Sequence, residues 1–350
     1  MKITVLGAGA WGTALAGLLS QNSGSRRRES AQNSSPKPES APTHVGGYEV
    51  TLWGHDAGHL ETMAQTFRNE RYLPGIELPR ELKLETDLMK ALASAEMVVV
   101  AVPSKAFRKV TAALKDFSGI VVSVTKGIEH ESGLTMCGIL EQTAPHAKLA
   151  ALSGPSLALE VARGVPTAIV AASNDTATAA AVQKIFHRPA FRVYTSNDLN
   201  GVELGGALKN VIAIAAGVCD GLGFGDNSKA ALVTRGLAEI RRLGVACGAQ
   251  SETFPGLSGL GDQMVTCFSK LSRNRGFGER LGRGEKVEAI LANAVSVAEG
   301  YPTAKSAYAL ARKLNIETPI IDEIYAALYE GKSPAQALHD LTTRESKAEN

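Results

Sequence analysis

The sequence predicts two domains, an α/β domain built on a doubly wound, mostly parallel sheet and an all-helical domain after it. Short β-branched or apolar runs alternate with helical patterns in the first part of the chain, and this alternation is typical of parallel sheets. After about Ser196 the strand patterns stop and consecutive helical patterns follow. Glycine supplies 35 of the 350 residues, against a usual share of about 7%, which favours tight turns and close backbone approach.

The expected elements of the first domain are short and regularly spaced. The strands are expected at Ile3–Leu6, Val50–Trp53, Met97–Val102, Ile120–Val124, Leu149–Leu152, Ala168–Ala171 and Phe191–Tyr194. Helical patterns lie between most of them, for example at Trp11–Leu19, Lys105–Leu114 and Thr176–Phe186. We therefore expect this domain to span residues 1–195.

Residues 21–47 fit neither pattern. They are rich in Ser, Pro, Asn and charge and have no apolar face, so they cannot bury enough surface to offset their ordering entropy. We expect a disordered insertion between the first helix and the second strand. The arginines at 26–28 could meet an anion, but a solvated loop is the stronger interpretation.

The second domain is expected over residues 196–342, with a polar tail at 343–350. Its expected helices are Asn200–Gly217, Lys229–Cys247, Leu260–Phe268, Arg275–Leu281, Lys305–Leu314, Thr318–Tyr329 and Pro334–Leu341. Because ligand sites favour interfaces between domains, we expect one in the cleft between these two.

Composition limits the classes of partner and compartment. The net charge of +2 argues against a nucleic acid or a membrane surface as the main partner. The cysteines form no C-x-x-C pair, which argues against a disulfide framework or a metal site and fits a reducing compartment. The chain begins directly with a strand pattern, and no apolar run looks long enough to span a bilayer. We expect a cytoplasmic protein.

The first strand runs into Gly7-Ala8-Gly9-Ala10-Trp11-Gly12, which opens a helix. A G-x-G-x-x-G in this context is typical of a dinucleotide-binding, Rossmann-like domain. Gly7 permits the tight turn, Gly9 lets the backbone approach a pyrophosphate, and Gly12 lets the helix pack on the strand. The helix N-terminus favours the anion. A merely glycine-rich turn is the alternative.

The end of the second strand, Trp53-Gly54-His55-Asp56, bears on the choice of cofactor. An acidic residue directly at the strand end would hold the ribose hydroxyls and repel a 2′-phosphate. Here Gly54 and His55 come first and Asp56 is displaced. The sequence therefore admits NADP alongside NAD and leaves room for a preference for NADPH.

Two later strand ends should face the same crevice. Lys126 follows the strand that ends at Val124, where it could bind an anionic or carbonyl oxygen; an exposed lysine in a turn is the alternative. Ser153-Gly154-Pro155-Ser156 resembles a helix start with Ser153 as its cap. This segment either begins an ordinary capped helix or places a helix N-terminus where it can bind a substrate.

The segment GGALKNVIAIAAG, residues 205–217, predicts a helix that is apolar or tiny almost all round, yet Lys209 and Asn210 lie near its start. Lysines are almost never fully buried unless paired. The helix neighbours of Lys209 and Asn210 are mostly glycine and alanine, which leave room for a ligand. Burial lowers the pKa of a lysine, so a neutral amine could take a proton from an alcohol. A lysine whose ammonium reaches water is the alternative.

A second set of polar residues follows in the helical part. Asp262 shares a helix face with Thr266, although it could equally cap the helix. Ser272-Arg273-Asn274 offers a forked donor and an amide that suit a phosphate, and a surface arginine pair is the alternative. Glu299 could cap the next helix or meet the cofactor.

Together these motifs resemble bacterial-type NAD(P)-dependent glycerol-3-phosphate dehydrogenase over nearly the whole chain. The matching stretches are VLGAGAWGTALA, LWGHD, VTKGIE, SGPSLALEVARG, GVELGGALKNVIAIAAG, NSKAALVTRGLAEI, GLSGLGDQMVTC, SRNRGFG and VAEGYPTAKSAYALA. The chain departs from the family at 21–47, where a very short turn is usual. The insertion should not abolish the fold, since long surface insertions cost little.

The resemblance implies reversible oxidation of sn-glycerol 3-phosphate to dihydroxyacetone phosphate, which supplies the glycerol backbone of phospholipids. It implies that Lys209 is the general acid and base and that Asp262 supports it. It implies substrate contacts at Lys126, Gly154, Ser156, Lys209, Asn210, Asp262, Ser272, Arg273 and Asn274. It implies cofactor contacts, beyond the three glycines of the first turn, at Ala10, Trp11, His55, Lys126, Ala158, Arg273, Val297 and Glu299. A homodimer is expected from the resemblance alone.

The expected mechanism follows from these roles. In oxidation, Lys209 takes the C2 hydroxyl proton as hydride passes to the nicotinamide, and in reduction it returns that proton to the alkoxide. Lys126 and Asn210 place the oxygen, while Arg273 and Asn274 anchor the phosphate. Ammonium groups supply the electrostatic stabilisation, so no metal site is expected. Two alternatives stay open: a related dehydrogenase acting on another hydroxy acid or acyl substrate, and a cofactor-binding regulatory module without catalysis.

Overall fold

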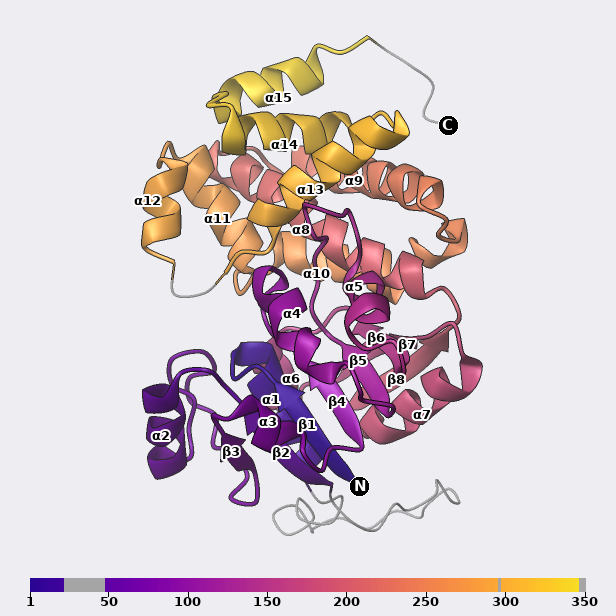
Figure 1. Cartoon of the computed structure of the whole chain (residues 1–350). Helices are drawn as coiled ribbons and strands as arrows, with labels where there is room; N and C mark the ends of the chain where they lie inside the picture. Colours follow the sequence, from indigo (N-terminus) through magenta and orange to yellow (C-terminus); the bar gives the residue numbers. More distant parts are fainter. Residues whose placement is uncertain (22–47, 295–296, 346–350) are drawn as a thin grey trace, which may run out of the picture.

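A computed structural model describes residues 1–21, 48–294 and 297–345. A half built on one sheet lies against a half built of helices (Figure 1). Apart from Gln21, the expected disordered insertion lies outside the described residues, as does the expected polar tail after Glu345.

The described strands form one eight-stranded sheet in the order β3-β2-β1-β4-β5-β6-β7-β8. Their bounds are β1 Lys2–Leu6, β2 Glu49–Trp53, β3 Lys83–Glu85, β4 Met97–Val100, β5 Ile120–Ser123, β6 Lys148–Ser153, β7 Thr167–Ala172 and β8 Phe191–Ser196. Neighbouring strands are parallel except β6 and β7, which are antiparallel. The prediction of a mostly parallel sheet is confirmed.

Helices cover both faces of the sheet. Their bounds are α1 Ala10–Ser20, α2 Ala57–Thr66, α3 Leu88–Leu92, α4 Ser104–Thr111, α5 Met136–Thr143, α6 Ala158–Ala162 and α7 Thr176–Phe186. Alternate strand residues face opposite cores: Ile3 and Val5 pack with α1, α2, α6 and α7, whereas Leu6 packs with α3, α4 and α5. Two covered faces explain why all four residues of the central strand β4 are apolar and buried.

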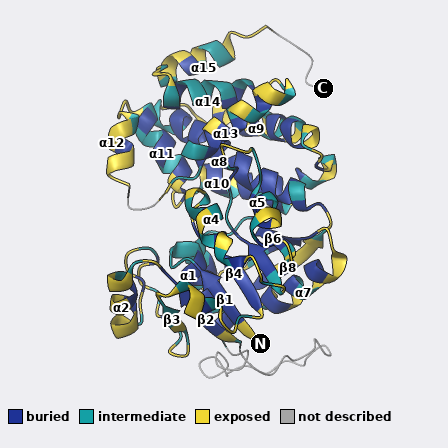
Figure 2. Cartoon of the chain, viewed as in Figure 1, coloured by how far each residue is buried: buried dark blue, intermediate teal, exposed yellow. Residues whose placement is uncertain are grey.

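The helical half is organised around one central helix, α8. The bounds are α8 Leu199–Gly221, α9 Asp226–Ala246, α10 Asp262–Phe268, α11 Arg273–Gly282, α12 Val287–Ala292, α13 Gly300–Leu314, α14 Pro319–Tyr329 and α15 Pro334–Thr342. Every residue of α8 from Gly201 to Cys219 is buried (Figure 2). A helix that is apolar all round must lie in a core, and the surrounding helices provide it.

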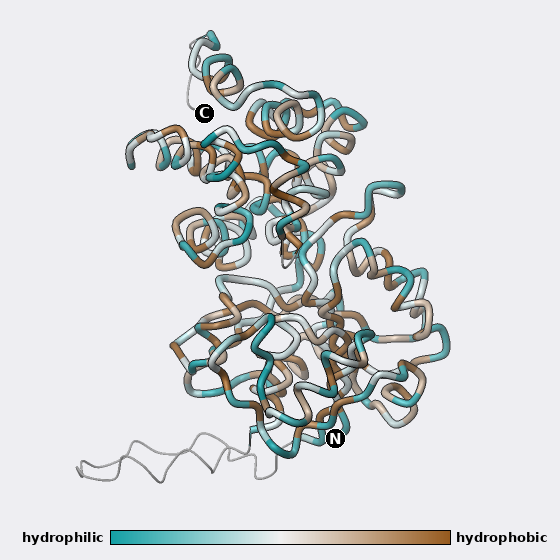
Figure 3. The backbone as a smooth tube through the Cα atoms, turned by 90° about the vertical axis from the view of Figure 1, so that its left-hand side faces the viewer, coloured by the Kyte–Doolittle hydropathy of each residue, from teal (hydrophilic) through white to brown (hydrophobic). Residues whose placement is uncertain are grey.

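The apolar character of α8 corrects one expectation. Its length and its mean hydropathy of 1.5 would also suit a membrane span, so the chain does contain an apolar segment of sufficient length. The whole of that apolar window is buried inside the fold, which is the position of a core helix. In Figure 3 apolar segments likewise run through the interior of both halves.

Candidate active site

A cavity of about 780 Å³ lies between the two halves. It opens at the carboxyl ends of β1, β2, β4 and β5, where the strand order reverses between β1 and β4, and α/β sheets bind ligands at such a switch point. The predicted residues that line it are Gly7, Gly9, Ala10, Trp11, His55, Lys126, Ser156, Ala158, Lys209, Asn210, Asp262, Ser272, Arg273, Asn274, Val297 and Glu299. Two further predicted residues, Gly12 and Gly154, do not line it.

The glycine turn after β1 has the geometry that a dinucleotide needs. Gly7 has a φ of 120°, a backbone conformation that residues with a side chain rarely adopt. A Cβ on Gly12 would lie 1.9 Å from the Gly7 carbonyl oxygen, so only glycine fits there. A Cβ on Gly9 would meet no atom within 4 Å. No side chain caps α1 at Gly9, so the first N–H groups of the helix are free for an anion. The turn therefore fits a pyrophosphate.

The carboxylate at the end of β2 is already engaged. Asp56 caps α2 by accepting from the backbone N–H of His59 at 3.0 Å, and its other oxygen lies 3.3 Å from Nη1 of Arg71. These contacts, with the hydrogen bond from His59 the larger cause, lower the pKa of Asp56. Arg71 and His55 both line the cavity, so this end of it is basic as well as acidic.

Lys209 is buried and paired. Its Nζ donates to Oδ1 of Asp262 at 2.9 Å and to Oγ1 of Thr266 at 2.6 Å, and the residue is only 6% exposed. The alternative of an ammonium in water is therefore wrong. Burial lowers the pKa of Lys209 to about 8, with Asp262 opposing the shift and the charge of Lys126 adding to it.

Asp262 joins two lysines instead of capping its helix. The N-cap of α10 is Gly261, and no side chain bonds there, so the capping alternative is wrong. The second oxygen of Asp262 accepts from Nζ of Lys126 at 2.5 Å. The two ammonium groups therefore lie on either side of one buried carboxylate, facing the cavity.

The carbonyl of Gly154 completes the setting of Lys126. It accepts from Nζ of Lys126 at 3.1 Å and from the hydroxyl of Ser156 at 2.9 Å. The expectation that Ser153 caps a helix is wrong, because β6 runs through Ser153 and α6 begins at Ala158 after its N-cap Leu157. The chain turns sharply instead, with Gly154 at a φ of 142°.

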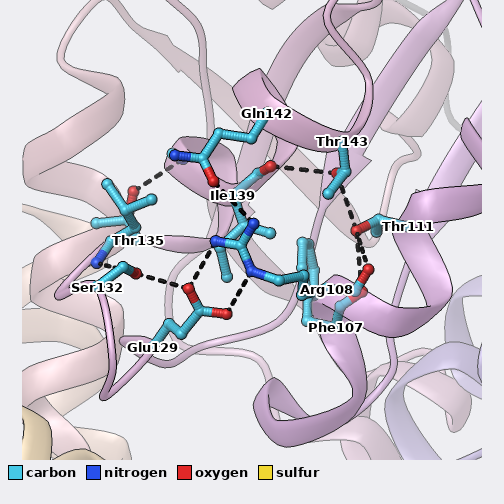
Figure 4. Close-up of polar contacts among 11 residues, drawn as sticks. Phe107, Arg108, Thr111, Glu129, Ser132, Thr135, Ile139, Gln142 and Thr143 are labelled. Atoms are coloured by element: carbon cyan, nitrogen blue, oxygen red, sulfur yellow. Dashed lines mark hydrogen bonds and ion pairs between the residues drawn. The ribbon is translucent and has the colours of Figure 1, made fainter. Parts of the chain in front are cut away.

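A polar network fixes the segment that follows Lys126 (Figure 4). Arg108 of α4 makes a two-pronged contact with Glu129, from Nε at 2.8 Å and from Nη2 at 2.6 Å. Its Nη1 reaches Gln142 of α5 at 2.8 Å, and the hydroxyl of Ser132 also donates to Glu129. Such forked pairs hold geometry well, so the loop that carries Lys126 is held between α4 and α5.

Two asparagines connect three helices at the floor of the cavity. The Asn274 amide donates to Oδ1 of Asn210 at 2.8 Å and accepts from the backbone N–H of Gly300 at 2.9 Å. No bond to the amide nitrogen of Asn210 is present in the part of the chain that the structure describes. That nitrogen is therefore free to donate to a ligand oxygen, while Asn274 mainly fixes α8, α11 and α13.

Arg273 brings an uncompensated cation into the cavity. Its guanidinium has no ion-pair or hydrogen-bond partner among the described residues, and the surrounding protein lowers its pKa by desolvation, with Glu299 opposing the shift. Ser272 precedes it and caps α11 by accepting from the backbone N–H of Arg275 at 3.2 Å. An unpaired arginine in a cavity is a natural anion site.

Glu299 links the two halves at the edge of the cavity. It is the N-cap residue of α13, but its side chain makes no capping bond there, so that alternative is wrong. Its carboxylate accepts from the backbone N–H of Ser104 at 3.1 Å and from the Ser104 hydroxyl at 2.5 Å. It therefore caps α4 of the other half. Burial raises the pKa of Glu299.

Comparison with known proteins decides which family uses this arrangement. A family model described as the NAD-dependent glycerol-3-phosphate dehydrogenase N-terminus matches residues 2–179, and one described as its C-terminus matches residues 198–339. The chain belongs to this dehydrogenase family. The resemblance inferred from the motifs is confirmed.

Individual relatives agree over the full length. Enzymes named glycerol-3-phosphate dehydrogenase [NAD(P)+] are 46% identical in Syntrophotalea carbinolica, over 100% of this chain and 99% of the relative, and 48% identical in Anaeromyxobacter dehalogenans, over 100% of both. A crystal structure of glycerol-3-phosphate dehydrogenase from Coxiella burnetii has a TM-score of 0.88 at 37% identity and covers 98% of this chain and 99% of that one.

The dehydrogenase therefore interconverts sn-glycerol 3-phosphate and dihydroxyacetone phosphate with NAD or NADP. The two alternatives, another hydroxy acid or acyl substrate and a regulatory module without catalysis, are set aside. Within the described residues, no group of three or more His, Cys, Asp or Glu side chains is placed to hold a metal. All four cysteines are free thiols.

Sequence reasoning missed much of the cofactor side of the dehydrogenase cavity. The missed lining residues include Trp53, His59, Arg71, Tyr72, Leu73, Pro74, Leu157 and Leu271. Arg71 lies in an irregular segment between α2 and β3, where no pattern singles it out. Thr266 did carry a signal, since its spacing from Asp262 places both on one helix face.

Proposed function

We propose that Lys209 is the general acid and base of the dehydrogenase. The observation that carries this is its burial beside Asp262 and Thr266, with a pKa of about 8. A group with a pKa near the working pH both accepts and donates protons efficiently. An ordinary surface lysine, with a pKa of about 10.4, would stay protonated and could not act as a base.

The hydrogen-bond count of Lys209 explains where the proton goes. An ammonium has three hydrogens, and two of them are used by Asp262 and Thr266. The third can point to the C2 oxygen of the substrate. When the substrate alcohol is oxidised, that oxygen gives its proton to neutral Lys209; when the ketone is reduced, the proton returns. The nicotinamide, when bound, accepts or supplies the hydride.

The remaining residues place the substrate. We assign the C2 oxygen to Lys126 and the free amide nitrogen of Asn210, and the phosphate to Arg273 with Ser272 and Asn274. The unpartnered guanidinium of Arg273 supports this assignment, because a phosphate supplies the charge that Arg273 otherwise lacks. Gly154 and Ser156 act through their contacts to Lys126 and to each other.

NADPH is the proposed preferred cofactor. Asp56, which could otherwise hold ribose hydroxyls, is occupied by the start of α2 and by Arg71. His55 and Arg71 line the same end of the cavity and can meet a 2′-phosphate. We assign the pyrophosphate to the turn at Gly7–Gly12 with Ala10 and Trp11, and the rest of the cofactor to Ala158, Val297 and Glu299.

The wider setting is also a proposal. We propose a dinucleotide-binding domain at 1–195 and a catalytic helical domain at 196–342, in a cytoplasmic enzyme that supplies glycerol 3-phosphate for phospholipids. The free thiols of all four cysteines support a reducing compartment. A homodimer is proposed from family membership alone.

One assay tests the proposed chemistry and the cofactor preference together. Oxidation of NADPH and NADH is followed with dihydroxyacetone phosphate and with unphosphorylated dihydroxyacetone. We expect turnover with the phosphorylated ketone, faster with NADPH at low cofactor concentration. Replacing Arg273 with Met should raise KM for the phosphorylated ketone at least tenfold. Equal rates with both ketones would contradict the phosphate assignment.

A further inference from the structure

Asn69 lies next to the cofactor end of the catalytic cavity and is completely buried. It belongs to the irregular segment between α2 and β3, its exposed fraction is 0%, and it does not line the cavity. Asparagines are mostly exposed, and a buried polar side chain needs hydrogen-bond partners. The partners of Asn69 show what this side chain holds in place.

Both hydrogens of the Asn69 amide nitrogen are engaged. Nδ2 donates to the carbonyl of Ala8 at 3.0 Å and to Oγ1 of Thr13 at 2.8 Å. Ala8 belongs to the glycine turn after β1, and Thr13 is a buried residue of α1. A carbonyl only accepts, so the atom that faces Ala8 must be a donor, which asparagine has and an ionised aspartate lacks. The amide therefore fastens the segment to the glycine turn and to the helix that follows it.

The oxygen atoms of Asn69 hold the residues that come after it. Oδ1 accepts from the backbone N–H of Tyr72 at 3.2 Å, and the backbone carbonyl accepts from the N–H of Leu73 at 2.8 Å. Arg71, Tyr72 and Leu73 all line the cavity. One buried side chain thus joins two walls of the cofactor end, the glycine turn and the segment 71–73.

The bond to Ala8 also fixes the direction of a neighbouring donor. The peptide bond between Ala8 and Gly9 is planar and trans, so its C=O and its N–H point in opposite directions. Because Asn69 holds the carbonyl on one side, the N–H of Gly9 is directed to the other side. That N–H has no acceptor among the described residues, and Gly9 lines the cavity. A donor that is already oriented loses little freedom when it binds an anion.

We propose that Asn69 is a positioning residue for the cofactor: it holds the N–H of Gly9 toward the pyrophosphate and so sets the affinity for NADPH and for NADH. The proposal rests on the placement of the pyrophosphate at the glycine turn. Asn69 acts through the peptide between Ala8 and Gly9, since it does not line the cavity itself. Its effect is common to the two cofactors because both carry a pyrophosphate, whereas Arg71 meets only the 2′-phosphate.

Asn69→Ser and Asn69→Asp test the proposal by fluorescence titration of the full-length protein with each cofactor. Both replacements keep an oxygen that can accept from Tyr72, but Ser is too short to reach Ala8 and ionised Asp has no hydrogen to donate. We expect the Kd for NADPH and for NADH to rise by a similar factor, at least about tenfold, the effect of weakening a hydrogen bond to a charged group. With saturating NADPH, kcat and KM for dihydroxyacetone phosphate should stay within about twofold of the wild type, a result that general loss of structure would not give.

Asn200→Ser is the matched control. Asn200 of α8 also donates from its amide nitrogen to a backbone carbonyl, that of Cys247 at 2.6 Å, but it does not line the cavity. This variant should lose thermal stability and keep the wild-type Kd for both cofactors. Three results would overturn the proposal: unchanged Kd values in the Asn69 variants, an equal rise in Asn200→Ser, or a rise confined to NADPH, which would mean that Asn69 acts through Arg71 alone.

Gly9→Ala tests the placement of the pyrophosphate separately. A Cβ on Gly9 meets no protein atom within 4 Å, and its φ of −76° suits alanine, so the variant should fold. It should weaken the binding of both cofactors, because the methyl group takes the space into which the pyrophosphate approaches. Weak binding by Gly9→Ala together with normal binding by the Asn69 variants would overturn the role of Asn69 alone. Normal binding by Gly9→Ala would overturn the placement, and the proposal with it.

Discussion

Nζ of Lys209 lies 2.9 Å from Oδ1 of Asp262, and both side chains are buried at the floor of the catalytic cavity. The other carboxylate oxygen holds Lys126 at 2.5 Å. One carboxylate therefore contacts two lysine side chains at the same time. Burial lowers the pKa of Lys209 to about 8; Asp262 opposes this shift and the charge of Lys126 adds to it.

Removing the proposed acid and base should abolish chemistry without abolishing cofactor binding. Lys209→Met keeps the apolar stem but carries no proton, so kcat should fall by about 10²–10⁴-fold, the usual contribution of general acid–base catalysis. The Kd for NADPH, measured by fluorescence titration, should change less than threefold. Lys115→Met, at an exposed lysine, is the control. A kcat within tenfold of the wild type would rule out the assigned role.

The direction of the pH dependence follows from the pKa of Lys209. Oxidation of glycerol 3-phosphate needs the neutral amine, so its kcat/KM should rise with pH and level off above about 8. Reduction of dihydroxyacetone phosphate needs the ammonium, so its kcat/KM should fall above about the same pH. The second phosphate ionisation, near about pH 6, lies too low to cause either change. Profiles of both directions between pH 6 and 10 provide the check.

The carboxylate of Asp262 should set the position of that inflection. Because its charge favours the protonated form of Lys209, Asp262→Asn should lower the lysine pKa and move both inflections to lower pH. Activity should also fall, since two ammonium groups would then face each other without an anion. Asp226→Asn, at an exposed position on α9, should leave the profile unchanged. An inflection that moves to higher pH would contradict the pairing.

The sequence predicted elements where the local pattern is strong and failed where tertiary structure decides. The apolar strands β1 and β4 are evident, but β3 has three residues, Lys83–Glu85, none of them fully buried, and no apolar run. The reversal between β6 and β7 has no local signature, because a strand reads the same in either direction. Ser153 resembles a helix cap in sequence, yet it ends a strand.

The site was predictable to a similar extent. Lys209 was identifiable because an ammonium in an apolar helix is rare. Its partner Asp262 lies 53 residues away. The residues alone left open whether Asp262 shares a helix face with Thr266 or caps the helix, and only the family resemblance linked it to Lys209. The contact between Ser104 and Glu299 spans 195 residues and depends on how the two halves meet. No local pattern contains that information.

Arg71 should discriminate between the two cofactors. Arg71→Met removes the cation proposed to meet the 2′-phosphate, so KM should rise roughly tenfold for NADPH and stay within twofold for NADH. Arg68→Met supplies the matched control, since Arg68 is an exposed arginine in the same segment that does not line the cavity. Equal increases in KM for both cofactors would mean that Arg71 holds the adenosine or the fold, not the phosphate.

Gly206 should control the position of Lys126. A Cβ on Gly206 would lie 2.6 Å from Oγ of Ser153 and 3.5 Å from Cγ of Lys126. The Ser153 hydroxyl is buried and has no hydrogen-bond partner among the described residues. Because no hydrogen bond holds it, the added methyl group can displace it against the alkyl chain of Lys126. Gly206→Ala should therefore raise KM for dihydroxyacetone phosphate several-fold and leave NADPH binding unchanged.

Rescue separates this effect from general damage to α8. Ser153→Ala removes the oxygen that the new methyl group meets, and because that oxygen makes no hydrogen bond, the single change should cost little. The double variant Gly206→Ala/Ser153→Ala should recover most of the lost kcat/KM. Gly276→Ala in α11, where a Cβ meets no atom within 4 Å, is the control for adding a methyl group to a helix. Thermal unfolding of Gly206→Ala should show no loss of stability, since alanine favours a helix over glycine by about 1 kcal/mol. If the double variant is as impaired as Gly206→Ala, the contact with Ser153 does not transmit the effect to Lys126.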